Sequence, residues 1–240
     1  NLIASAQSPL GENDEEEQNN DEIRWDKAQE LWYQIAVDPN YSRSGLYRSL
    51  QVQADKIKGS IERELKKNSG SNLRQKVDRL NGLRIKSLKK LSRAFGFARE
   101  FAEKTEKWND LLNQANPNQQ VIEKKVAITE ELSQFAADQI RKSDKELDAK
   151  GRAVLKEASD LNRFIIAQLG ATVASVFAAA GNSSSILSDW AALAPAMQKG
   201  IRTTCSLQNA VVDYTDKRSI QLPKDSIITE EESDKIPDDD

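Results

Sequence analysis

A window without a single charged residue limits what this chain can fold into. It covers residues 164–188, FIIAQLGATVASVFAAAGNSSSILS, although 30% of the 240 residues in the chain are charged. Extending the window to Gln198 adds only the charge of Asp189. Such a segment has to be shielded from water. It can be a helix buried on all sides in a bundle, or a helical hairpin that enters a membrane.

Helical periodicity runs through most of the rest of the chain, and no segment alternates apolar and polar residues convincingly as a strand would. The pattern predicts five helices, over residues 22–37, 44–67, 72–115, 119–180 and 185–212. A helix of about 40 residues is ~60 Å long at a rise of 1.5 Å per residue. The sequence therefore predicts an all-α fold, an elongated antiparallel helical bundle of about five helices with two long central helices.

The two ends of the chain differ from its middle in composition. Residues 1–21 are acidic and lack apolar periodicity, and residues 215–240 end in acidic runs interrupted by proline. We expect both ends to be disordered and residues 22–214 to form the helical bundle. The compartment is left open, although Ala4-Ser5-Ala6 fits the small-x-small cleavage pattern that ends a secretory signal peptide.

The net charge of -3 conceals a segregation of charge along the chain. Residues 1–40 carry ten acids and two bases, whereas residues 41–107 carry 18 bases and seven acids. Acids again outnumber bases in residues 108–240. A basic middle between acidic ends suits an anionic partner such as a lipid headgroup or a nucleic acid. It equally suits internal neutralisation, in which the ends fold back on the middle.

One stripe of the predicted helix 72–115 is basic. It supplies six candidate residues for binding an anionic surface: Lys76, Arg79, Lys86, Lys89, Lys90 and Arg93. Such a stripe can bind anionic lipid, follow a phosphate backbone, or be an ordinary solvated face. No aromatic residues are interleaved with it, which weakens the nucleic-acid interpretation. Arg84 lies instead in the apolar seam, where we expect it to snorkel or to pair with an acid on a neighbouring helix.

The uncharged segment can form a hairpin with arms over residues 164–180 and 186–197. Each arm is shorter than the ~20 residues that a helix needs to cross a bilayer. The membrane-insertion candidates are its large apolar side chains: Phe164, Ile165, Ile166, Leu169, Val173, Val176, Phe177, Ile186, Leu187 and Trp190. The competing interpretation makes the same residues the core of a central helix.

The sequence predicts neither a catalytic site nor a metal site. The chain has no histidine, so no side chain titrates near neutral pH without a perturbed environment. It also lacks a Gly-rich phosphate loop, a nucleophile elbow and a CxxC pair, and Cys205 is its only cysteine. We therefore expect a protein that is not an enzyme and that needs no cofactor.

Long amphipathic helices around one uncharged, Ala/Gly/Ser-rich hairpin resemble the architecture of the α-helical pore-forming toxins of the haemolysin type. The resemblance rests on residues 164–198 within the helical body 44–212, and no residue role is carried over from it. It implies a protein that associates with a membrane or forms a pore through the uncharged segment and the basic stripe. The alternatives are a scaffolding bundle that binds a helical protein partner or a second copy of itself and, more weakly, a basic bundle that binds nucleic acid.

Overall fold

The computed structural model describes Ile57, Gly59 and residues 70–112, 119–178 and 184–222 of the chain. Within these ranges there are no strands and five helices: α4 (Gly70–Phe95), α5 (Ala98–Leu112), α6 (Gln119–Lys142), α7 (Ala149–Ala178) and α8 (Ser184–Lys217). The predicted all-α helical bundle is confirmed. The helix predicted over 22–37 and the N-terminal arm lie outside the described residues, as does all of the helix predicted over 44–67 except Ile57 and Gly59.

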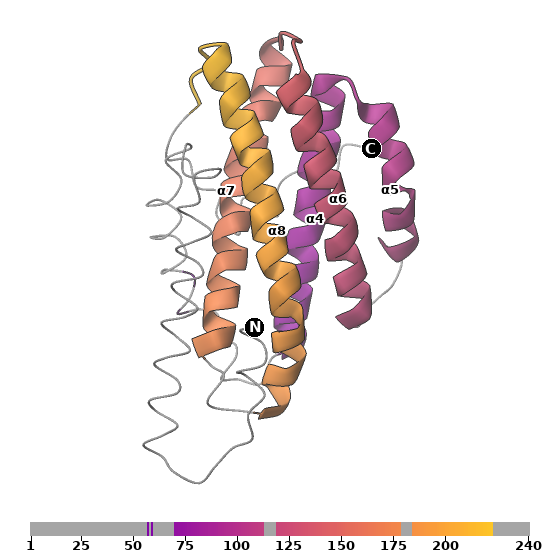
Figure 1. Ribbon diagram of the computed structural model, residues 1–240, viewed down its shortest axis with the longest axis vertical. Coiled ribbons are helices and arrows are strands. Elements are labelled where there is room, and N and C mark those ends of the chain that lie inside the picture. The colour runs from indigo at the N-terminus through magenta and orange to yellow at the C-terminus, as the bar shows by residue number, and fades with distance from the viewer. Residues whose placement is uncertain (1–56, 58, 60–69, 113–118, 179–183, 223–240) are drawn as a thin grey trace.

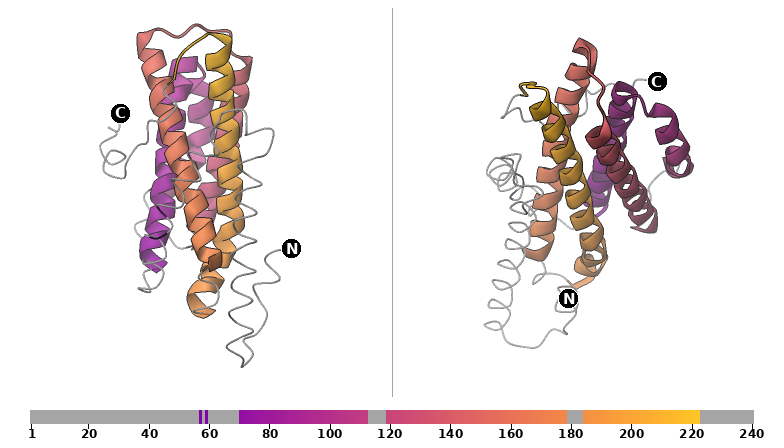
Figure 2. Two further views of the ribbon diagram at one scale, coloured as in Figure 1. Left: turned by 90° about the vertical axis from the view of Figure 1, so that its left-hand side faces the viewer. Right: turned by 45° about the horizontal axis from the view of Figure 1, so that its top comes forward.

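Four of the helices form an elongated bundle, and the fifth lies beside it (Figure 1). α4 and α8 each pack against both α6 and α7, which places α4 and α8 diagonally across the bundle. α5 packs on the outside, against α6 and α4. Consecutive helices run antiparallel (Figure 2). Within the four-helix bundle, α4, α6 and α8 therefore run in the same direction, and α7 runs in the opposite direction.

The prediction of one continuous helix over residues 72–115 is wrong, because the chain reverses at Gly96 and forms two helices, α4 and α5. The N–H groups of Gly96 and Phe97 both donate to the carbonyl of Ser92, each at 2.9 Å, which closes the end of α4. Gly96 has a φ of 89°, a conformation that residues with a Cβ rarely adopt. The turn sends α5 back along the bundle and makes α4 and α6 parallel neighbours.

Replacing Gly96 with alanine is expected to destabilise the protein by ~1–2 kcal/mol, because the left-handed backbone there is strained for any residue with a Cβ. The matched control is Gly82→Ala in the middle of α4, where a Cβ would meet nothing within 4 Å. That change should stabilise by up to ~1 kcal/mol through helix propensity. Urea unfolding of both variants checks the prediction, which fails if the two changes have the same sign.

The helix predicted over residues 119–180 is also divided, by a six-residue connection between α6 and α7. Asp148 begins α7 as its N-cap, since its Oδ1 accepts from the backbone N–H of Gly151 at 2.7 Å. The connection is tied to two other helices. Lys145 Nζ donates to the carbonyl of Ala94 at 2.7 Å, and the hydroxyl of Tyr214 donates to the carbonyl of Lys145 at 2.5 Å.

α8 extends beyond the predicted end of the last helix at residue 212 and continues to Lys217. Ile220 and Leu222, which follow it, pack against the apolar core. This part of the C-terminal segment therefore contributes to the bundle.

The core of the bundle consists of two apolar clusters, one after the other along its axis. The first apolar cluster includes Val77, Leu80, Leu83, Ile122, Val126, Leu161, Ile165, Leu169, Leu193, Met197 and Ile201. The second apolar cluster lies toward the α6–α7 connection and includes Leu88, Leu91, Phe95, Phe101, Leu132, Ile140, Leu155, Val211 and Tyr214. Ile57, which precedes α4 in the sequence, also packs against the first apolar cluster.

Candidate functional site

The uncharged segment contributes the most enclosed helix of the described structure. Every residue of α7 from Ala158 to Ser175 is buried. Five insertion candidates are at most 5% exposed and belong to the first apolar cluster: Phe164, Ile165, Ile166, Leu169 and Val173. The side chains of the other five, Val176, Phe177, Ile186, Leu187 and Trp190, lie outside the described part of the structure. Among the described helices, none is both long and apolar enough to span a membrane.

The basic stripe lies on α4, where the predicted spacing places it. Arg79, Lys89 and Arg93 are exposed, whereas Lys76, Lys86 and Lys90 are half-buried. Lys90 forms an ion pair with Glu157 of α7, with 2.9 Å between Nζ and Oε1. The structure thus separates the two sets of candidates. The described apolar ones lie in the core, and the basic ones lie on one face of α4.

A third feature, which no local sequence pattern predicts, is a layer of polar side chains between the two apolar clusters. We call it the polar layer, and it consists of Arg84, Glu130, Ser133, Ser159, Asn162, Thr203 and Gln208. Four different helices contribute to it. Asn162 of α7 bonds to Gln208 of α8, and the Gln208 amide donates in turn to Ser159 at 2.7 Å.

Arg84 occupies the part of the polar layer where α4, α6 and α8 meet. It is only 2% exposed, so snorkelling to solvent, one of the two arrangements expected for it, does not occur. Its Nη2 donates to Ser133 Oγ at 3.2 Å and to Thr203 Oγ1 at 2.7 Å, whereas Nε and Nη1 have no hydrogen-bond partner among the described residues. Burial lowers the pKa of Arg84 to about 10, and the charge of Glu130 partly opposes this shift.

Glu130 is the carboxylate whose charge acts on Arg84, but its ion pair is with a different base. It is 5% exposed, and its Oε2 lies 2.8 Å from Nζ of Lys199, which sits at the surface of α8. Burial raises the pKa of Glu130 above 4.5, and the hydrogen bond and charge of Lys199 act in the opposite direction. Glu130 therefore interacts with two cations: it forms an ion pair with the exposed Lys199, and its charge also stabilises the charged form of the buried Arg84.

The absence of a side chain at Gly200 leaves room for the guanidinium of Arg84 against the backbone of α8. A Cβ at this position would lie 3.2 Å from Nη1 of Arg84 and 3.6 Å from Leu169. The sequence signal for this contact was weak, because a glycine in α8 and a base in the seam of α4 are more than 100 positions apart. Only Arg84 itself was noticeable from the apolar pattern.

The pH dependence of stability offers a test of the Glu130 environment. A carboxyl whose pKa is higher in the folded than in the unfolded chain lets the folded chain bind more protons, so its contribution to stability falls as the pH rises above about 4.5. Glu130→Gln removes this contribution. Urea unfolding between about pH 4.5 and about pH 8 should show the variant gaining stability relative to the parent as the pH rises. A relative loss would place the folded-state pKa below 4.5.

The described residues contain no group of three or more Cys, Asp or Glu side chains that could hold a metal ion. Cys205 is buried in the first apolar cluster. The candidate features are therefore a basic surface, an enclosed apolar helix and a polar layer. No protein-family model matches the chain, and no curated protein or solved structure shows significant similarity to it.

Proposed function

We propose that this protein is a non-enzymatic helical interaction protein that binds an anionic membrane surface through the basic face of α4. The observation that carries the proposal is the charge of this helix, which has eight bases and a single acid. The exposed residues Arg79, Lys89 and Arg93 span 14 positions, or ~21 Å of helix. A row of this length can contact several lipid headgroups at once.

The one acid of α4 supports the proposal, because it is engaged elsewhere. Both carboxylate oxygens of Asp78 accept from Nζ of Lys125 on α6, at 2.8 and 3.1 Å. Asp78 therefore neutralises a buried base of a neighbouring helix. Each base near an anionic bilayer surface contributes ~1 kcal/mol of attraction, so three exposed bases are enough for salt-sensitive binding.

Flotation with phosphatidylcholine vesicles, with and without phosphatidylserine, tests the proposal. We expect binding only to the anionic vesicles and release by high salt. The triple variant Arg79→Glu, Lys89→Glu, Arg93→Glu should weaken binding by at least ~100-fold, since three attractions of ~1 kcal/mol are lost and then reversed.

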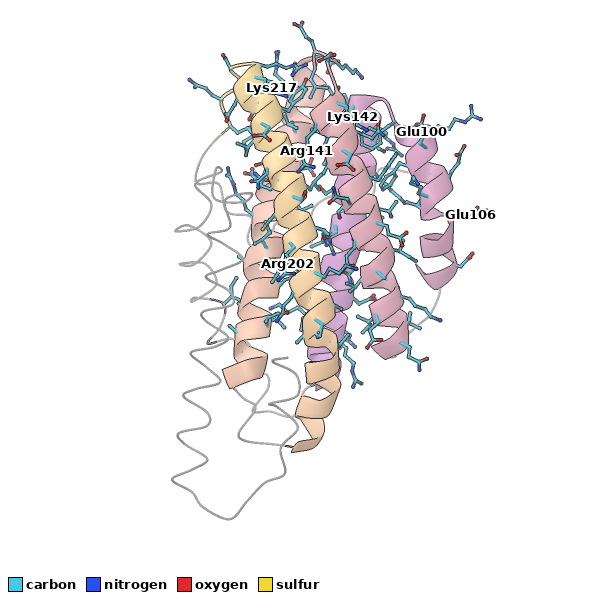
Figure 3. The ribbon with its side chains drawn as sticks, viewed as in Figure 1. Glu100, Glu106, Arg141, Lys142, Arg202 and Lys217 are labelled. Atoms are coloured by element: carbon cyan, nitrogen blue, oxygen red, sulfur yellow. The ribbon has the colours of Figure 1, made fainter. Side chains whose placement is uncertain are left out.

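The matched control reverses three exposed bases on α6 and α8: Lys124→Glu, Lys142→Glu and Arg202→Glu. Lys142 and Arg202 are labelled in Figure 3, and the net charge changes by the same amount as in the test variant. We expect it to retain most of the binding. Equal losses in both variants would mean that net charge rather than the α4 face decides, and no binding to any vesicle would overturn the proposal.

A scaffolding bundle that binds a protein partner is the second candidate. The burial of Phe164, Ile165, Ile166, Leu169 and Val173 favours it, because these side chains already have a structural role in the core. Insertion of the uncharged segment into a membrane would require them to leave that core. In the flotation experiment, binding that survives high salt would indicate such insertion.

A further inference from the structure

The polar layer interrupts the apolar core at Arg84, for which the described residues offer no full set of hydrogen-bond partners. Along α4, Leu83 belongs to the first apolar cluster and Ile85 to the second, and Arg84 lies between them. Two of its three guanidinium nitrogens, Nε and Nη1, are buried without a hydrogen bond among the described residues. A buried charge with unmet donors is costly, and the lowered pKa of Arg84 reflects the same desolvation.

The hydroxyls of Ser133 and Thr203, which accept hydrogen bonds from Arg84, are also hydrogen-bonded to the backbone of their own helices. Ser133 Oγ donates to the carbonyl of Thr129 at 2.7 Å, and Thr203 Oγ1 lies 3.1 Å from the carbonyl of Lys199. Each hydroxyl therefore stays bonded to its own helix when the Arg84 contact breaks. Separating α4 from α6 and α8 at Arg84 therefore costs only the two bonds of its Nη2, and it lets the guanidinium regain water.

On the side of the first apolar cluster, the cross-helix ties named above are ion pairs between side chains, Lys125 with Asp78 and Lys199 with Glu130. The second apolar cluster instead has ties from side chains to backbone carbonyls across the helices at its far end. Lys145 bonds to the carbonyl of Ala94, Tyr214 bonds to the carbonyl of Lys145, and Arg218 bonds to the carbonyl of Ser143. The rings of Phe95 and Tyr214 also pack edge to face at 4.9 Å between centroids. The part of the bundle beyond the polar layer on this side is held by contacts that do not involve the layer.

We propose that the polar layer at Arg84 is a boundary of cooperativity, across which the first apolar cluster opens as a unit while the second stays folded. Such an opening exposes the uncharged face of α7 from Phe164 to Val173 without unfolding the whole chain. This inference does not rest on the binding of α4 to anionic surfaces. It identifies the conformational step by which the enclosed helix becomes accessible.

Native-state amide hydrogen exchange of the full chain in low urea tests the proposal. Amides of residues 164–173 and 193–201 should share one opening, with protection at least about tenfold below that of Leu88, Leu91, Ile140 and Val211 in the second cluster. Arg84→Met should raise the protection of the first group by about 10- to 100-fold and reduce the difference, because the buried charge is removed.

Two further variants separate charge from packing. Arg84→Lys keeps a buried cation and should leave the difference in protection in place, and Arg152→Met, at an exposed position of α7, should change neither group. The proposal is overturned if both clusters of the unmodified protein exchange with the same protection and the same urea dependence. It is also overturned if Arg84→Met folds and leaves the difference unchanged.

Discussion

Val173→Asp is expected to remove ~4–5 kcal/mol from the free energy of unfolding at neutral pH, a large share of the ~5–15 kcal/mol that is usual for a folded protein. Val173 is 4% exposed within the first apolar cluster, and all residues around it on α7 from Ala158 to Ser175 are buried. The new carboxylate would have to lie uncompensated in an apolar environment, which is among the most costly of single changes. Urea unfolding followed by circular dichroism measures the loss.

The pH dependence of this loss identifies its cause. Burial raises the pKa of an introduced carboxyl, so the variant should be less impaired at about pH 4.5 than at neutral pH. Ala153→Asp is the matched control, because Ala153 is exposed on the same helix, and its effect should stay within ~0.5 kcal/mol. A folded and fully stable Val173→Asp variant would mean that the segment is not part of the core.

Phe101→Ala is expected to cost ~3–5 kcal/mol and to loosen α5 from the bundle. Phe101 is 2% exposed and is the side chain that the described part of α5 places in the second apolar cluster. Phe97, just before α5, packs edge to face on Phe135 of α6 at 5.7 Å between ring centroids. Among the described helices, α5 packs mainly against α4 and α6, so the loss of the Phe101 ring should weaken its hold on the bundle.

Urea unfolding together with hydrogen exchange along α5 checks this expectation. Glu106→Ala serves as the control on the same helix, since Glu106 is exposed and labelled in Figure 3 away from the bundle. It should change stability by no more than ~0.5 kcal/mol. If Phe101→Ala were as mild as the control, α5 would be held by contacts other than the second cluster.

The features that sequence reasoning predicted correctly are those that a local pattern encodes. Leu80, Leu88 and Leu91 recur at helical spacing, and the structure buries all three. The apolar run from Phe164 to Val173 carries no charge, and it forms the enclosed helix that one of the two interpretations expected. Periodicity of this kind reflects the 3.6-residue turn of a helix and needs no knowledge of the partner.

The ends of the helices were harder to predict, for a physical reason visible at Gly96. Apolar residues continue at helical spacing on both sides of it, so the period alone indicates one long helix. The break depends on the left-handed conformation of Gly96 and on the burial of Phe97 and Phe101 against α6. The start of α7 was hard to predict for a similar reason. An aspartate such as Asp148 acts as an N-cap only if a helix begins directly after it, and the apolar period does not show where that happens.

By itself, the sequence determined that the chain is helical, which segment has to be shielded from water and that one helix carries a basic face. Each of these follows from residues that are close together along the chain. Only the tertiary structure decided that α5 returns along the bundle and that α4 runs parallel to α6. It also brought Arg84 from α4, Ser133 from α6 and Thr203 from α8 into contact. The physical reason is that this buried site is assembled from three helices, and their relative positions depend on long-range packing that no local pattern contains.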